Sequence, residues 1–188
     1  MALVLLAAPA AEPVTLAEAK AWLRVDAADD DATIGTLITA ARQWLEARLR
    51  IMLISQRWRW ILDAWPPGPI LQPPAGPLRS VEAMRVYSAG SVASALATSA
   101  WQADTASLRG RIALQGPLPS PGRPLNGVEI DLTVGLAATA ADLPAPLKEA
   151  VLQTVAFLYE NRGDAPDPTL ALPAAVEALA FPWRVRRL

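Results

Sequence analysis

The 188-residue sequence contains no cysteine and no histidine. The chain therefore cannot form disulfides, thiol nucleophiles or Ser-His and Cys-His couples, and it lacks the usual ligands of zinc and non-haem iron. Its glycines form neither a GxGxxG turn after a strand nor a GxxxxGK[ST] loop, the two common nucleotide-binding signatures. No apolar run approaches the roughly 18 residues of a membrane span. Most familiar active sites are excluded, and we expect no enzyme, no cofactor and no membrane partner.

The sequence also has little excess charge. Its 17 basic residues balance 18 acidic residues to a net charge of −1. A surface that neutralises many phosphates, as in an ordinary DNA-binding domain, is therefore not expected. Apolar residues make up 53% of the chain and charged residues 19%, which indicates a globular protein with ample surface to bury.

Two helices are predicted near the N-terminus, after a strand and linker in MALVLLAAPA. The first begins at Thr15 with a capping box to Glu18, and the second extends from Asp30 or Asp31, one of which caps it, to about Arg50. The spacing of Arg42 and Glu46 predicts an ion pair on the solvent side of the second helix. The inner face of the first helix is predicted to hold Leu16, Ala19, Trp22 and Leu23, and that of the second Ile34, Leu37, Ile38, Ala41, Leu45 and Leu49.

Strands are predicted in the middle of the chain. In SQRWRWILDAW the side chains alternate, with Trp58 and Trp60 on a dry face and Arg57 and Arg59 on a wet one. The six prolines between Pro66 and Pro77 exclude a central strand there. Shorter strands are predicted at Val81–Tyr87, Leu108–Leu114 and Val128–Val134, the last after a tight turn at Asn126-Gly127.

Helical periodicity returns after Gly135. A helix is predicted from Pro144 or Pro146 to a left-handed cap at Gly163, followed by a short helix around Ala174–Leu179. The fold class is therefore α+β: a small α-helical bundle with an inserted β-rich region and an extended C-terminal tail. The predicted parts are the N-terminal helices (1–54), the β-rich region (55–135), the C-terminal helices (136–180) and the tail (181–188).

Two clusters invite a functional interpretation that their context does not favour. Arg57-Trp58-Arg59-Trp60 contains the residues of a stacking platform for single-stranded nucleic acid, but alternation places the two residue types on opposite faces. The acidic loop has oxygen ligands suited to Mg²⁺ or Ca²⁺, but it lacks calcium-loop spacing and lies where a helix needs a cap. We therefore predict no metal site at Asp26, Asp29, Asp30 and Asp31.

The C-terminal segment FPWRVRRL is the strongest candidate for a binding site. Tryptophan and arginine dominate binding hot spots, and a short extended segment that carries both can dock in a partner's groove. Two other interpretations remain: a frayed terminus, or a segment packed on its own domain through Phe181 and Trp183. The predicted docking residues are Phe181, Pro182, Trp183, Arg184, Val185, Arg186, Arg187 and Leu188.

The order of these pieces resembles the head-tail connector, or adaptor, family of long-tailed bacteriophages and gene transfer agents. The likeness begins in PVTLAEAKAWLRVDAADDDATIGTLITAARQWLEARLR and continues through the Trp-bearing strand, the proline-rich stretch before Ser80-Val81, the strand VEIDLTVG, the helix from Leu143 to Gly163 and the terminal FPWRVRRL. It covers nearly the whole chain, and the order of the motifs, rather than any one of them, is diagnostic.

The resemblance implies a structural protein of the virion neck, assembled in the bacterial cytoplasm. Such adaptors form a ring, with twelve copies expected, between the portal protein and a stopper or tail-side neck protein, and double-stranded DNA passes through the lumen without sequence-specific binding. The portal-binding segment carries over to Phe181–Leu188. The broad apolar face of the helix at 147–159 predicts a subunit interface at Leu152, Ala156 and Phe157. A nucleic-acid-binding or tail-accessory module using the β-rich region is the alternative.

Overall fold

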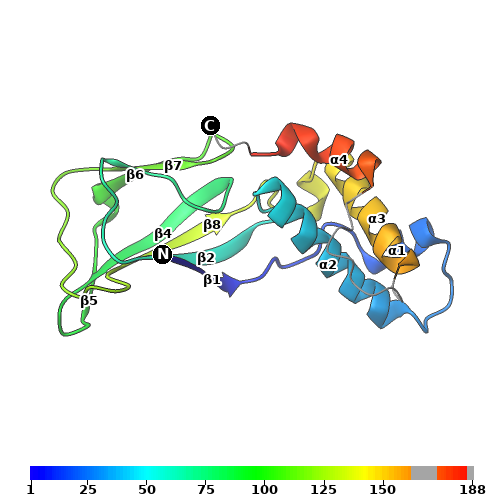
Figure 1. The fold of residues 1–188 in the computed structure, drawn as a ribbon, viewed down its shortest axis with the longest axis horizontal. Coiled ribbons are helices and arrows are strands. Elements are labelled where there is room, and N and C mark those ends of the chain that lie inside the picture. The colour runs from blue at the N-terminus through cyan, green and yellow to red at the C-terminus, as the bar shows by residue number, and fades with distance from the viewer. Residues whose placement is uncertain (162–172, 186–188) are drawn as a thin grey trace. The chain divides into compact units, whose positions relative to one another are not determined.

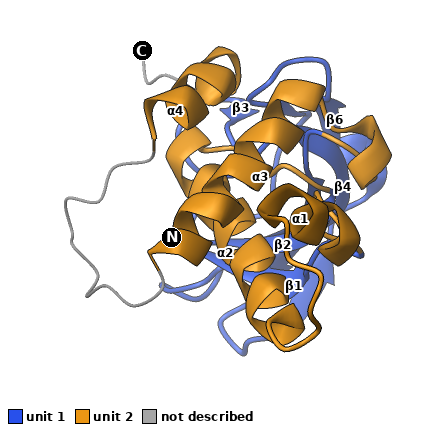
Figure 2. Ribbon diagram, turned by 90° about the vertical axis from the view of Figure 1, so that its right-hand side faces the viewer, with its two compact units in different colours: residues 1–10, 55–136 blue, residues 11–54, 137–188 orange. Residues whose placement is uncertain are grey.

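The computed structural model describes residues 1–161 and 173–185. They form two compact units, Met1–Ala10 with Ser55–Leu136 and Ala11–Ile54 with Ala137–Leu188 (Figure 2). The first unit is built from strands and the second from helices, which confirms the predicted α+β class. The first ten residues, grouped with the helices by sequence, belong to the β unit because strand β1 (Ala2–Ala7) pairs with β2 (Gln56–Leu62).

The helical unit contains α1 (Leu16–Leu23), α2 (Asp31–Leu49), α3 (Ala145–Glu160) and α4 (Ala174–Ala180), with short 3₁₀ turns at Ala140–Asp142 and Phe181–Trp183 (Figure 1). The capping box of α1 is confirmed, with the Glu18 N–H donating to Thr15 Oγ1 and the Thr15 N–H donating to Glu18 Oε2. Trp22, predicted on the inner face, is instead 43% exposed. The helix has only two turns and its contact with its neighbours centres on the buried Ala19.

Helix α2 follows its predicted pattern with one exception. Leu37 is half-buried at the edge of the inner face, while the other five predicted residues are buried: Ile34, Ile38, Ala41, Leu45 and Leu49. Asp30 occupies the N-cap position, but its side chain makes no capping bond and instead accepts a hydrogen bond from the Tyr159 hydroxyl of α3. The prediction that the Asp30 side chain caps α2 is therefore wrong, because its carboxylate binds Tyr159 instead of the backbone N–H groups of the helix.

The ion pair predicted on α2 forms, but the prediction that it faces solvent is wrong. Arg42 Nη1 lies 2.8 Å from Glu46 Oε2, but both side chains are only 6% exposed. Residues outside the helix cover them: Glu12 binds Arg42 at 2.6 Å, and the Leu53 N–H donates to Glu46 Oε1 at 2.9 Å. Helical spacing predicted the pair, but it carried no information about the segments before α1 and after α2 that cover it.

In α3 the side chains of Leu147, Ala150, Val151, Thr154 and Val155 are buried. The Trp44 ring of α2 lies 6.3 Å from the Phe157 ring, centroid to centroid, in a tilted arrangement. The helix ends at Glu160, and the predicted cap at Gly163 lies outside the described residues. Helix α3 is therefore the shared partner of α1, α2 and α4.

The β unit consists of two antiparallel sheets. The larger has the order β1–β2–β8–β4–β5, where β8 is Val128–Val134, β4 Leu78–Tyr87 and β5 Ala93–Ala95. The smaller has the order β3–β7–β6, with β3 Ile70–Leu71, β7 Arg111–Leu114 and β6 Trp101–Asp104 after a 3₁₀ turn at Thr98–Ala100. The prediction for Val128–Val134 is confirmed, whereas β3, β5 and β6 were not predicted because they are too short for a periodic pattern.

Two turns set the limits of these strands. The predicted strand at Leu108–Leu114 begins only at Arg111, because Gly110 has a positive φ of 64° and a Cβ there would lie 2.4 Å from that of Leu78. Asn126 is also left-handed, with φ of 54°, in the turn that enters β8. Only glycine fits the first position, since its backbone lies against β4.

The alternation predicted for β2 is confirmed, and it places an ionic cluster around the buried Asp131. Trp60 and Leu62 are buried on one face, while Arg59 on the other pairs with Asp131 of β8. Arg59 Nε and Arg85 Nη1 lie 2.6 and 2.7 Å from the two Asp131 oxygens. Burial alone would raise the pKa of Asp131, but these hydrogen bonds outweigh it and hold the pKa below its ordinary value. One carboxylate thus links three neighbouring strands.

We predict that Asp131→Asn destabilises the protein by about 2 kcal/mol, because it removes the negative charge that pairs with both Arg59 and Arg85, whose side chains are already partly desolvated. Urea unfolding followed by tryptophan fluorescence measures the loss. Glu160→Gln, at the exposed end of α3, is the matched control and should leave the midpoint unchanged. Equal midpoints for the two variants would contradict a role for the cluster in holding β2, β8 and β4 together.

Candidate functional site

The candidate docking segment follows directly from α4. Val176 and Ala180 anchor that helix in the core, with exposed fractions of 0% and 3%. The Arg48 Nε atom of α2 lies 2.6 Å from Glu177 Oε1, so an exposed ion pair also holds α4 to α2. The start of the candidate segment is therefore positioned by two of the helices.

Within the segment, Phe181–Trp183 form a 3₁₀ turn rather than an extended chain, and the backbone becomes extended at Arg184. The Val185 N–H donates to the Leu49 carbonyl at the end of α2, at 3.1 Å. This bond satisfies one of the carbonyls that a helix leaves without an internal partner at its C-terminus. The segment is thus attached to the helical unit as far as Val185, and Arg186, Arg187 and Leu188 lie outside the described residues.

The side chains of this segment remain accessible even though its backbone is attached. Phe181 is 53% exposed, Pro182 and Arg184 are exposed, and Trp183 is half-buried. Large apolar side chains cost free energy when they face water. An exposed phenylalanine beside an accessible tryptophan and arginine therefore forms a surface suited to a protein partner.

The predicted subunit interface lies on α3. Leu152, Ala156 and Phe157 are all half-buried, and the Phe157 ring contacts Trp44. Their side chains are neither core nor fully exposed. This is the burial expected at the rim of the helical core.

The acidic loop is held by contacts within the protein. Asp31 pairs with Lys20 at 2.6 Å, and Asp30 accepts from Tyr159. No group of three or more metal-ligating side chains occurs among the described residues. The side chains of Asp30 and Asp31 therefore act in helix packing.

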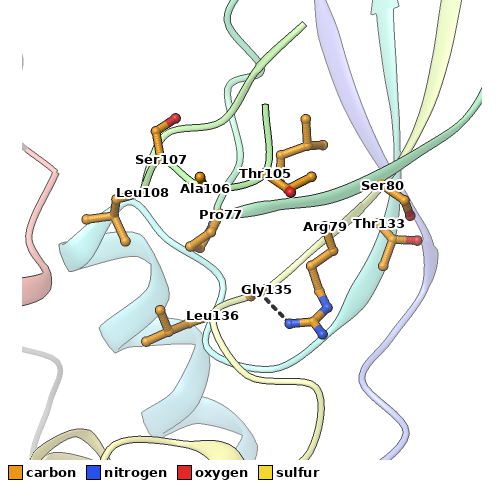
Figure 3. Close-up of a pocket in the computed structure, with 11 residues that line it drawn as sticks. Pro77, Arg79, Ser80, Thr105, Ala106, Ser107, Leu108, Thr133, Gly135 and Leu136 are labelled. Carbon is orange, nitrogen blue, oxygen red and sulfur yellow. Dashed lines mark hydrogen bonds between the residues drawn. The ribbon is translucent and has the colours of Figure 1, made fainter. Parts of the chain in front are cut away.

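The β unit contains a pocket of about 620 Å³ (Figure 3). It lies between the start of β4, the loop before β7 and the end of β8, and Arg79 reaches into it toward the Gly135 carbonyl, 3.5 Å away. Its other polar lining consists of the hydroxyls of Ser80, Thr105, Ser107 and Thr133. None of these lining residues is a carboxylate, so the pocket holds no acid–base pair for catalysis.

In the described residues no helix is long and apolar enough to cross a membrane.

The comparisons with known proteins agree with one another. Residues 13–86 match the family described as "Phage gp6-like head-tail connector protein". A chain from "Neck of empty GTA particle computed with C6 symmetry" is 34% identical, with a TM-score of 0.82, and the match covers 100% of this chain and 97% of that one. This protein belongs to the phage head-tail connector family. A comparison with curated proteins finds no match.

Two further structures extend the likeness to this head-tail connector. A chain from "Virion of native gene transfer agent (GTA) particle" is 33% identical with a TM-score of 0.83. A chain from "Neck of native GTA particle computed with C12 symmetry" is 32% identical with a TM-score of 0.78. Each match covers 100% of this chain and 97% of the other. The family predicted from the order of motifs is confirmed, and the connector is a structural protein, not an enzyme.

Sequence patterns missed two features of this connector's surface. Trp22 was assigned to the core, yet its indole is accessible on α1. The strand β1 was predicted, but its exposure was not: Val4, Leu5 and Leu6 are 44%, 46% and 38% exposed. An apolar run with no alternating polar residue does not indicate which of its side chains face water. The exposure of β1 follows instead from its position at the edge of the sheet, which only the structure shows.

The connector's α1 also contains a carboxylate whose titration can be followed. Hydrogen bonds from Lys148 and from the Thr15 backbone lower the pKa of Glu18 from 4.5 to about 2. A group whose folded-state pKa is depressed stabilises the fold above its unfolded pKa and loses that contribution as the pH falls. The contribution of Glu18 is therefore complete above about pH 4.5 and decreases toward pH 2.

We predict that Glu18→Gln flattens the dependence of stability on pH between pH 4.5 and pH 2. Unfolding midpoints measured across this range, for the variant and the unchanged protein, give the comparison. Glu149→Gln on α3 serves as the control and should keep the original slope. A Glu18 signal that titrates by NMR at an ordinary glutamate pKa would contradict the contact with Lys148.

Proposed function

We propose that this protein is a ring-forming adaptor of the virion neck, which joins the portal of the DNA-filled head to the next neck or tail component and lines the DNA channel. The observation that carries the proposal is the end-to-end likeness to a chain of a native GTA neck computed with C12 symmetry, at 32% identity. The match covers 100% of this chain and 97% of the other, so the likeness extends over the β unit as well as the helices.

The ring is proposed to contain twelve copies that contact one another head to tail. Such heterologous contacts produce closed cyclic symmetry when the rotation between neighbours closes. The half-buried Leu152, Ala156 and Phe157 of α3 are proposed to contribute to this contact. Apolar surface at the rim of a core favours association because its burial removes it from water.

The distribution of charge suits a channel through which DNA must slide. Each phosphate neutralised by lysine or arginine adds salt-dependent affinity, so free basic side chains would slow the passage of DNA. The net charge is −1. Many basic side chains in the described residues also have a carboxylate partner, namely Lys20, Arg42, Arg48, Arg59, Arg85, Arg111 and Lys148.

Portal docking is assigned to Phe181–Leu188. The exposed Phe181, the accessible Trp183 and the exposed Arg184 support this assignment, since these residue types contribute most to binding hot spots. Attachment of Val185 to Leu49 orients the segment, so that part of the entropy of ordering is lost before binding rather than at assembly.

We predict that Phe181→Ala or Arg184→Ala weakens binding to purified portal by at least about tenfold, because each truncation removes a hot-spot side chain. Co-sedimentation in the ultracentrifuge measures the affinity. Leu125→Ala is the matched control, since Leu125 is an exposed apolar side chain in a loop of the β unit. The circular dichroism spectrum should be unchanged for all three variants.

Undiminished portal binding by both tail variants would overturn the assignment of the segment. DNA binding by the protein in the absence of portal would favour the nucleic-acid-binding module over the adaptor. Images of purified necks would test the ring directly, and a neck without a ring of this chain would overturn the proposed function.

A further inference from the structure

In the part of the chain that the structure describes, the larger sheet has two free edges, and neither carries a charged side chain. Strand β1 forms one edge and β5 the other. The sequence contains no charged side chain in residues 1–11 or 86–103, the two stretches that hold these strands. Sheet edges present unpaired N–H and C=O groups, and soluble proteins usually protect them with charged residues, proline or a covering segment. Both ends of this sheet lack charged protection.

The exposure of the two edges supports the same conclusion. On β1 the large side chains of Val4, Leu5 and Leu6 are 38–46% exposed, and the pairing with β2 shifts register between Leu5 and Ala7. All three residues of β5 are exposed, and Val92, just before it, is 66% exposed. In a monomer such edges are prone to pair with other chains. Because both edges of the sheet are left unprotected in this way, we expect assembly to cover them.

The strand directions determine how two copies could join. Each step across the sheet, from β1 through β2, β8 and β4 to β5, is antiparallel. Four such steps leave β1 and β5 running in the same direction. Neighbours in a ring differ by a small rotation, so β1 of one copy would meet β5 of the next in parallel. The register also aligns them: Ala2, Ile61, Glu129, Arg85 and Ala95 form one row across the sheet.

We infer that β1 of one copy pairs with the β5 edge of the next copy, so that the larger sheet continues from subunit to subunit. The inference rests on the proposed ring and identifies one of its contacts. A second copy is favoured over a different protein because one head-to-tail joint covers both uncharged edges of every subunit, whereas another protein on β1 would leave β5 open. Strand β5 is short, so the apolar side chains of β1 and Val92 supply much of the contact.

The absence of cysteine makes a cross-linking test specific. Within one copy, β1 and β5 are separated by three strands, or about 19 Å at ~4.8 Å per strand step, which exceeds the ~7 Å Cα separation that a disulfide can bridge. Any disulfide between cysteines placed on the two edges must therefore join two copies. Ala2→Cys with Ala95→Cys tests the aligned register, and Val4→Cys with Ala95→Cys tests a staggered one.

The experiment uses particles assembled with each double variant, oxidised and separated on a non-reducing denaturing gel. We expect a ladder of multimers of this chain, which single-cysteine variants should not produce. If particles and their neck rings form normally but neither double variant gives a ladder, the inference is overturned while the proposed function stands. If β1 cysteines are instead captured by a different particle protein with a thiol-reactive cross-linker, the choice of a second copy is overturned. If necks contain no ring of this chain, the proposed function fails as well.

Charge substitution provides an independent measurement. Ala2→Lys and Ala95→Lys each place a charge on an exposed edge position of the same row, and each should lower incorporation into necks at least tenfold. Ala2→Lys combined with Ala95→Glu should restore much of it, which a folding defect would not allow. Leu125→Lys is the matched control for an added charge at an exposed apolar position and should incorporate normally. Normal incorporation of both single edge variants would contradict the shared sheet.

Discussion

The helical unit depends on a closure between two distant parts of the chain. Helices α1 and α2 precede residues 55–136, and α3 and α4 follow them. The Ala137 N–H donates to the Leu53 carbonyl at 3.0 Å, and Ile54 forms a parallel bridge with Ala137. These contacts hold the two ends of the inserted segment side by side. The entropy lost in closing so long a loop is offset by burial of Ile51, Leu53 and Ile54.

The segment after α2 that contains Leu53 also explains why Glu46 is buried. Its carboxylate accepts the Leu53 N–H and receives Arg42, which also binds Glu12 before α1. A buried carboxylate without these partners would be costly, whereas one that is fully hydrogen-bonded favours a single arrangement of the segments around it. Glu46 thus links the end of α2 to the point where the chain leaves for the β unit. Asp131 has a comparable role among β2, β8 and β4.

The surfaces proposed for assembly differ in chemistry, which suits a protein with unlike neighbours. The C-terminal segment offers accessible aromatic and arginine side chains on a backbone attached to α2. The α3 rim offers apolar side chains beside an aromatic contact. The sheet edges offer backbone hydrogen bonds with little charge. Hot-spot side chains give specificity for a partner's pocket, whereas an edge strand is well suited to repeated pairing with an identical chain.

The sequence by itself determined the family, the α+β class, the capping box of α1, the inner face of α2 and the full extent of β8, because each depends on local periodicity or on the order of motifs. It also placed Phe181, Trp183 and Arg184 at the candidate site, since residue type alone suggests a hot spot. Short strands such as β3 and β5 could not be predicted, because two or three residues are too few to show a period of two.

Tertiary structure alone decided which side chains are covered and which remain accessible. Arg42 and Glu46 became buried because Glu12 and Leu53, which lie outside the helix, close over them. Trp22 and the side chains of β1 became exposed because no described element covers them. Helical and strand periods assign residues to faces. Whether a face meets water depends on long-range contacts, and these do not leave a local pattern in the sequence.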